Sequence, residues 1–195
     1  METLVKTSNR KQQIHQQAMV MFRAKGYAAS SMRDLAQVLG IEAASLYSHI
    51  SSKQQILHKI CFDMASSFFK AIETNNLKDP VNRLRLAIIS HFKVIADQPD
   101  ASAVFFNEWR HLEEPALAEF LSLRANYQEF FDKAIRQGIE TGRFRRIDNK
   151  LAVMTVLSAL NWTHQWYRPD GALSKDEIGD QLSQLLISGL ANTKV

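Results

Sequence analysis

Apolar residues recur at helical spacing along almost the whole chain, and no long stretch alternates apolar and polar residues with a period of two. These repeats are separated by Gly, Pro, Ser, Asn and Asp residues. Together, the repeats and their breaks predict helices over about 9–25, 31–39, 43–49, 52–73, 80–97, 100–112, 115–142, 148–167 and 174–190. The predicted fold class is all-α.

The stretch SMRDLAQVLGIEAASLYSHI, residues 31–50, holds two short apolar stripes on either side of one glycine. Gly40 can adopt a left-handed backbone conformation and end the first of these helices in a tight turn. Ser30 or Ser31 is expected to cap that helix, and Glu42 stands before the next. The second short helix buries Leu46 and turns a polar face outward, formed by Ser45, Tyr47, Ser48 and His49.

The composition changes at ETNNLKDP, residues 73–80, where turn-forming residues cluster and Pro80 opens the next helix. The chain is therefore predicted to have a head at 1–52 and a larger helical body at 75–195. A helix over 52–74, capped by Ser51 or Ser52, connects them. No internal repeat or low-complexity segment appears.

Charge is distributed unevenly between these parts. Residues 1–60 hold eight Lys and Arg against three acids, a net charge of +5, whereas the remaining 135 residues have a net charge of −1. A positive field confined to the head is what a module that meets phosphate would need. A solvated basic surface is the simpler alternative.

The composition also indicates the cellular compartment. The single cysteine excludes an intramolecular disulfide, and the polar start METLVKTSNRKQQ does not resemble a signal peptide. The apolar run at 151–162 is too short and too polar to span a bilayer of about 20 residues. We expect a soluble, cytoplasmic protein that does not enter the membrane.

The stretch from Gly26 to Leu57, GYAASSMRDLAQVLGIEAASLYSHISSKQQIL, resembles the DNA-binding head of the TetR family of bacterial repressors. The Gly-Tyr stop, the Ser-Met-Arg-Asp-Leu-Ala helix, the Leu-Gly-Ile turn, Leu-Tyr-x-His and the Ser-Lys start of the fourth helix occur in the family's order and spacing. The sequence departs from the family at Ile50, where an aromatic is commoner, and at Glu42, where Ser or Thr is the usual cap.

The resemblance implies a helix-turn-helix whose second helix enters the major groove of double-stranded DNA with its first residues. Two alanines at that position let the backbone approach, and their methyl groups can meet thymine methyls. Arg33 is the candidate for a bidentate contact with guanine, unless Asp34 pairs with it. The expected DNA-binding residues are Ser31, Arg33, Ala43, Ala44, Ser45, Tyr47, Ser48, His49 and Lys53.

Several of these side chains have simpler interpretations. Tyr47 could pack inside the head beside Leu46, and His49 and Lys53 could be solvated surface charges. Their expected role is to contact phosphate oxygens, which fixes register on the duplex and does not read sequence.

The resemblance further implies that the body forms a homodimer and binds a small-molecule inducer, which releases the repressor from a palindromic operator. Periodicity agrees with dimerisation, because the helix over 148–167 is apolar on more than one face and the last helix adds an apolar stripe. A two-fold partner could cover the face that the body leaves exposed, giving a four-helix interface. A monomer core is the alternative.

The body is rich in aromatic residues, most of which must belong to its core. A minority could line an apolar cavity with polar residues near its mouth. The segment NWTHQWYRPDGALSKDEIGDQL is similar to a TetR subgroup that often regulates acyl-CoA catabolism, which implies an acyl-CoA or other lipid-derived effector, with Arg110, Arg124 or Arg168 for its phosphates. The expected ligand-binding residues are Phe105, Trp109, Asn161, Trp162, Trp166 and Tyr167.

Two other classes of function are alternatives to a ligand-responsive repressor. An enzyme is not indicated, because the chain has no Gly-rich phosphate loop, HExxH motif, nucleophile elbow or cysteine pair, and its six histidines lack metal-ligand spacing. We therefore expect no catalytic residue, metal or cofactor, and interpret Cys61 as a core residue and His111 with Glu113 and Glu114 as a solvated loop. A ligand-independent architectural DNA-binding dimer is the second alternative.

Overall fold

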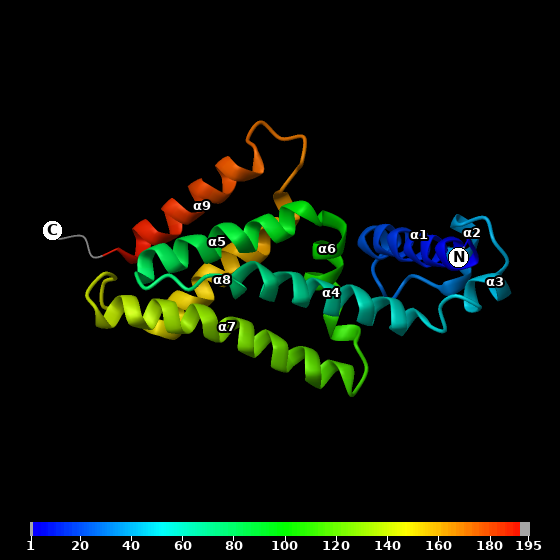
Figure 1. Ribbon diagram of the computed structural model, residues 1–195, viewed down its shortest axis with the longest axis horizontal. Coiled ribbons are helices and arrows are strands. Elements are labelled where there is room, and N and C mark those ends of the chain that lie inside the picture. Colours follow the sequence, from blue (N-terminus) through cyan, green and yellow to red (C-terminus); the bar gives the residue numbers. More distant parts are fainter. Residues whose placement is uncertain (1, 192–195) are drawn as a thin grey trace. The chain divides into compact units, whose positions relative to one another are not determined.

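The computed structural model describes residues 2–191, with side chains from Arg10 onward, and its regular elements are helical (Figure 1). The one exception is a single antiparallel bridge between Phe144 and Ala191. The helices are α1 (Glu2–Lys25), α2 (Met32–Val38), α3 (Ala43–Tyr47), α4 (Lys53–Glu73), α5 (Pro80–Asp97), α6 (Pro99–Glu108), a short 3₁₀ turn η1 (Trp109–His111), α7 (Ala116–Glu140), α8 (Asn149–Trp166) and α9 (Lys175–Leu190). The all-α prediction is confirmed.

Capping residues fix most helix starts. Ser31 caps α2 in a reciprocal capping box, in which its hydroxyl accepts from the Asp34 amide at 3.1 Å and the Asp34 carboxylate accepts from the Ser31 amide at 3.1 Å. Ser52 accepts from the Gln55 amide at the start of α4. Glu42 precedes α3 without a side-chain hydrogen bond to the helix, so α3 begins without a side-chain cap. Gly40 has the expected positive φ of 64° in the turn between α2 and α3.

The chain divides into two compact units, which we describe separately. The first comprises residues 1–64 with 100–120, and the second comprises 65–99 with 121–195. The long helix α4 therefore contributes its first part to one unit and its last part to the other. The segment 100–120 falls within the predicted body at 75–195, but it packs with the head.

The core of the first unit is built from the apolar stripes that the periodicity predicts. Ile14 and Phe22 of α1, Leu35 of α2 and Leu46 of α3 are almost completely buried, and Leu57 of α4 completes the packing. Burial of these stripes stabilises α2 and α3, because helices of seven and five residues are too short to persist alone.

The core of the second unit lies among α5, α7, α8 and α9. The helices α5 and α9 run side by side in Figure 1 and make the most extensive contact in this unit. The approach is close because Gly179 of α9 is buried against Ile89 and Phe92 of α5. Between residues 2 and 191, no helix is both long and apolar enough to cross a membrane.

Candidate functional site

The outward face of α3 is exposed, as the helical spacing predicts. Leu46 is fully buried and anchors the helix, whereas Ala44 and Ser45 are exposed at its N-terminal end. Tyr47 is 51% exposed, which excludes the alternative in which its ring packs inside the head. The Ser48 hydroxyl donates to the Ser45 carbonyl at 2.7 Å, so it helps to close the C-terminal end of this short helix.

Arg33 lies exposed on α2, beside this face. The carboxylate of Asp34 is committed to the capping box at Ser31 and does not form an ion pair with Arg33. These hydrogen bonds lower the pKa of Asp34 below its usual value, which keeps the capping carboxylate charged. The guanidinium of Arg33 is therefore not held by its neighbour, in contrast to the alternative weighed from the sequence.

Lys53 takes a different position from the free surface charge expected of a phosphate ligand. Its ammonium donates to the carbonyl oxygens of Tyr27 at 2.8 Å and Ser30 at 2.7 Å, and lies 4.1 Å from the centre of the Tyr27 ring. Lys53 thus ties the start of α4 to the loop between α1 and α2. The remaining predicted residues of this face, Ala43 and His49, are half-buried at its edge.

Tyr27, which was not among the predicted site residues, is central to the first unit. Its ring is 94% buried, and burial raises the pKa of its hydroxyl to about 12. It stacks on His111 with ring centres 5.3 Å apart, and Gln54 of α4 donates to the His111 carbonyl at 2.6 Å. His111 therefore contacts the head while its side chain stays 45% exposed, and Glu113 and Glu114 are exposed beside it, as predicted for a solvated loop. The Gly-Tyr pair at 26–27 was the only sequence signal for this contact.

An ion pair adds to the contact between α1 and the 100–120 segment. Arg23 near the end of α1 pairs with Asp100 at the start of α6. Proximity of these residues could not be predicted from periodicity, since 77 positions separate them along the chain.

The six predicted ligand-binding residues are divided between the two compact units. Phe105 and Trp109 belong to the first unit, where both rings pack on Phe120. The other four belong to the second unit, where they have different surroundings. Tyr167 is a core residue packed edge-on against Phe92, and Trp162 is 63% exposed.

A buried polar cluster lies inside the second unit, and only one of its members was predicted. His91 is 98% buried; its Nδ1 lies 3.1 Å from the Tyr127 hydroxyl, and it also hydrogen-bonds the Asn161 side chain. Phe68 and Phe131 pack around the imidazole. Burial lowers the pKa of His91 to about 3, so the ring is neutral, and burial raises the pKa of Tyr127. The cluster offers hydrogen-bonding groups within an aromatic interior.

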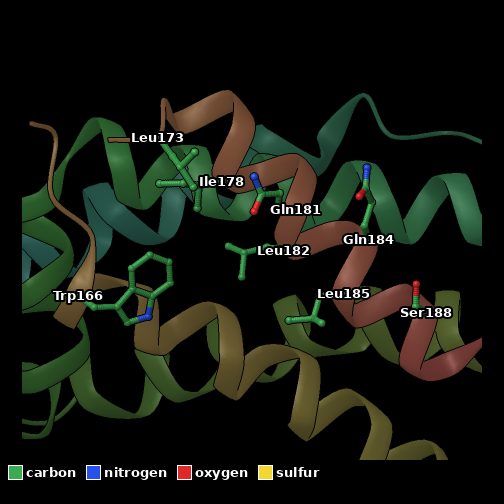
Figure 2. A pocket seen from close by; sticks show the side chains of 8 residues that line it. All are labelled: Trp166, Leu173, Ile178, Gln181, Leu182, Gln184, Leu185 and Ser188. Carbon is green, nitrogen blue, oxygen red and sulfur yellow. The ribbon is translucent and has the colours of Figure 1, made fainter. Parts of the chain in front are cut away.

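A groove and several exposed apolar side chains lie on α8 and α9. A groove of about 590 Å³, which we call the α8–α9 groove, is lined mostly by α9 and by Trp166 at the end of α8. Figure 2 shows Trp166, Leu182 and Leu185 directed into it. Large apolar side chains on the two helices and the loop between them are exposed here, with Leu185 at 73%; the others are Leu151, Met154, Trp162, Trp166 and Leu173. An apolar surface of this extent is typical of a protein interface.

Two models of known protein families match this chain, one in the head and one in the body. The model of the "Bacterial regulatory proteins, tetR family" head matches residues 14–60, and the "Tetracyclin repressor-like, C-terminal domain" matches residues 77–190. The chain is 27% identical over 190 residues to the "HTH-type transcriptional repressor KstR2" of Rhodococcus jostii, covering 95% of this chain and 93% of that protein.

Solved structures of TetR-family regulators resemble this chain. The TetR family transcriptional regulator PfmR from Thermus thermophilus is 32% identical, with a TM-score of 0.80 over 92% of this chain and 99% of that one. AibR, solved in complex with isovaleryl coenzyme A and operator DNA, has the same fold at 24% identity, with a TM-score of 0.80 over 91% of this chain and 98% of that one. The model of the C-terminal domain alone matches more than half of the chain, and the model of the head matches most of the remainder. The chain therefore belongs to the TetR family of bacterial regulatory proteins.

Proposed function

We propose that the protein is a dimeric, cytoplasmic transcriptional repressor that binds a palindromic operator and is released from it by a small acyl-CoA or related lipid-derived effector. The observation that carries the first part is the exposed polar face of α3, which is anchored by the fully buried Leu46 and lies next to the exposed Arg33 of α2. A helix presented in this way can lie in the major groove with its first residues at the base edges.

The roles on this face follow from size and chemistry. Ala44 and Ser45 at the exposed start of α3 face base edges, where a methyl group meets thymine and a hydroxyl donates. Arg33 reads guanine, and the exposed hydroxyl of Tyr47 contacts phosphate. Lys53 acts mainly by fixing the loop at Tyr27 and Ser30, which positions the face, since both contacts already occupy its ammonium.

Ala44→Glu tests the DNA-binding assignment. The new carboxylate would meet the acidic groove, so operator binding should fall below detection in a fluorescence-anisotropy titration. Ala125→Glu adds the same charge at an exposed position of α7 and serves as the matched control. Equal operator affinity in the two variants would show that this face does not enter the groove.

A dimer is part of the proposal because a palindrome is read by two heads about one helical turn of DNA apart, ~34 Å. The exposed apolar side chains of α8 and α9 supply the surface that a second copy would cover, and the same surface on both copies satisfies two-fold symmetry.

The effector proposal is supported by two observations. AibR, which shares the fold, was solved with isovaleryl coenzyme A and operator DNA. In this chain, His91, Tyr127 and Asn161 place polar atoms in an aromatic interior, where they can hydrogen-bond the polar end of an otherwise apolar ligand. An effector that favours a different spacing of the two heads weakens operator binding. A coupling free energy of ~1–3 kcal/mol between the effector and the operator would lower operator affinity about 5- to 150-fold.

The experiment has two stages. Random duplex DNA is selected on the purified protein, and binding of the enriched sequence is then measured with and without a panel of acyl-CoA esters. One enriched palindrome that is released by one ester supports the full proposal. Enrichment without release by any effector would favour an architectural DNA-binding dimer, and no enrichment would contradict the DNA-binding role.

A variant separates effector binding from DNA binding. Tyr127→Phe removes a hydroxyl from the buried cluster without opening a cavity, so operator affinity should be unchanged while the releasing ester is needed at a higher concentration. If Tyr127→Phe responds to the ester as the wild type does, the buried cluster is not the recognition point.

A further inference from the structure

A second groove, of about 650 Å³, lies in the second unit between the C-terminal part of α4 and the middle of α7. We call it the α4–α7 groove. None of its residues was predicted as a site residue, and all are distinct from those of the α8–α9 groove. Its volume falls in the range of small-molecule sites.

Basic side chains from three helices line this groove: Lys70 of α4, Arg83 of α5 and Lys133 of α7. The acids are Glu73 and Glu129, of which Glu129 pairs with Lys133 at 2.8 Å. An adjoining recess of about 390 Å³ shares Arg83 and adds Lys78, so the two together have a net charge of +2. An anionic ligand is therefore favoured over a cationic one.

Arg83 is positioned at both its side chain and its backbone. Its guanidinium lies 4.7 Å from the centre of the Phe130 ring, and its backbone carbonyl accepts a hydrogen bond from the Asn75 side chain at 2.8 Å. A planar guanidinium that is already ordered loses little freedom when it forms two parallel hydrogen bonds with a phosphate.

Two polar atoms at this position lack a partner. Asn75 is 97% buried, and its Oδ1 accepts no hydrogen bond from residues 2–191; the Nε of Arg83 is likewise buried without an acceptor there. Buried polar atoms are nearly always hydrogen-bonded. Both residues line the basic groove, where a polar ligand that opens the cover over these two atoms would supply the missing partners.

The wall of the groove is aromatic as well as basic. Phe69 lines it and stands edge-on to Tyr127, with ring centres 5.6 Å apart. Tyr127 in turn contacts His91 in the buried cluster. An aromatic ring beside an ordered arginine is the combination that binds a planar base together with its phosphates.

We propose that the α4–α7 groove binds a nucleotide, with its base on Phe69 and its phosphates at Arg83, Lys70 and Lys133. The ligand has two possible sources, a free nucleotide or the nucleotide part of coenzyme A. The coenzyme A source rests on the proposed function, because the acyl end of the ester would then begin beside Tyr127, next to the buried cluster.

Isothermal titration calorimetry of the full-length protein tests the site directly, with adenosine 3′,5′-bisphosphate as the probe and adenosine as the comparison without phosphate. We expect the bisphosphate to bind and adenosine to bind far more weakly. Lys70→Met and Arg83→Met each remove a charge-assisted hydrogen bond and should weaken the bisphosphate roughly tenfold or more. Lys150→Met, at an exposed lysine of α8 outside the groove, should leave affinity unchanged.

Lys70 is exposed, so we expect Lys70→Met to fold. This variant therefore still tests the site if Arg83→Met fails to fold. No binding of the bisphosphate, or equal affinity in Lys70→Met and Lys150→Met, would overturn the proposal. Tighter binding of coenzyme A than of ATP assigns the ester as the source, and the reverse order assigns a free nucleotide.

Failure of this inference is distinguishable from failure of the proposed function. If an acyl-CoA ester releases the operator equally well from the wild type and from Lys70→Met, the groove is not the coenzyme A site and the repressor proposal stands. If coenzyme A binds in the groove but no ester releases the operator, the site stands and the effector proposal is wrong.

Discussion

At the residue scale, the clearest lesson comes from Lys53. A lysine at the start of a helix that follows a DNA-reading element suggests a phosphate contact. In the structure, two carbonyl oxygens and an aromatic ring surround its ammonium instead. The carbonyls belong to the loop 26–31, in which the Ser30 amide donates to the Tyr27 carbonyl and the Ser30 hydroxyl donates to the Gly26 carbonyl, so Lys53 adds to the hydrogen bonds of that loop.

Lys53→Met tests this structural role. The variant keeps the aliphatic stem but loses both hydrogen bonds and the cation–π contact, so the free energy of unfolding should fall by about 2 kcal/mol in chemical denaturation. The control is Lys59→Met, at an exposed lysine whose only ion pair in the described chain is the surface pair with Asp63. That loss should cost less than about 0.5 kcal/mol. Equal stability of the two variants would contradict the role of Lys53.

His91 gives a pH-dependent prediction at the same scale. Burial lowers its pKa to about 3 in the folded protein, against about 6.5 in an unfolded chain. The unfolded state therefore binds the proton first, and stability that is present above about pH 6.5 is lost as the pH falls toward 3. Between pH 7 and pH 5 this group alone should lower the free energy of unfolding by about 2 kcal/mol.

His91→Gln checks that sign, because glutamine can still hydrogen-bond Tyr127 and Asn161 but does not titrate. Denaturant unfolding at pH 7 and pH 5 gives the free energy of unfolding at each pH. The decrease between the two should be smaller by about 2 kcal/mol in the variant than in the wild type. An undiminished loss would mean that other groups, such as the partly buried His15, whose pKa is also lowered by burial, account for the acid sensitivity.

At the scale of the elements, the junction of α7 and α8 shows how one small residue sets a packing geometry. Phe144, in the loop after α7, folds back over Gly138, and its amide donates to the Gly138 carbonyl at 2.9 Å. A Cβ at Gly138 would lie 2.1 Å from the Phe144 ring. The same loop pairs with the end of α9 through Phe144 and Ala191, so the position of the ring affects three elements.

Gly138→Ala should therefore displace Phe144 and lower the free energy of unfolding by about 1–3 kcal/mol, despite the better helix propensity of alanine. Gly189→Ala is the control, since a Cβ there meets nothing within 4 Å and should stabilise α9 by about 0.5–1 kcal/mol. Thermal melts of both variants measure the contrast. A stabilised Gly138→Ala would show that the loop can move at little cost.

At the scale of the whole molecule, the proposed function requires a dimer, and the surface of α8 and α9 is its proposed interface. Five exposed apolar side chains and the groove beside Trp166 would be costly to leave in water on two neighbouring helices. A second copy that covers them also sets the distance between two heads, which is the quantity that an effector has to change.

Leu185→Glu tests the dimer, because it places a charge on the most exposed leucine of this surface. Sedimentation velocity should show a shift from dimer to monomer, with loss of binding to a two-half-site operator. Leu121→Glu, at a leucine of α7 that is 45% exposed, adds the same charge elsewhere and should remain dimeric. A dimeric Leu185→Glu would place the interface on another surface.

Much of the local structure could be predicted from the sequence. Helix positions and their caps followed from periodicity and from residues such as Ser31, Gly40 and Pro80, because these signals act over a few residues. The outward face of α3 was predicted for the same reason: on so short a helix, burial of Leu46 decides which side chains face water.

The tertiary structure decided what depends on contacts between distant residues. The sequence could not show that Lys53 is bound by the loop at Tyr27, that 100–120 packs with the head, or that His91 meets Tyr127 and Asn161. Aromatic residues were the least predictable, since a helical stripe does not distinguish a core ring such as Tyr167 from a surface ring such as Trp162. By itself, the sequence determined the helices, the exposed face of the head and the family resemblance, because local patterns carry them. The groups that can meet a ligand were decided only by the packing of helices that are far apart in the chain.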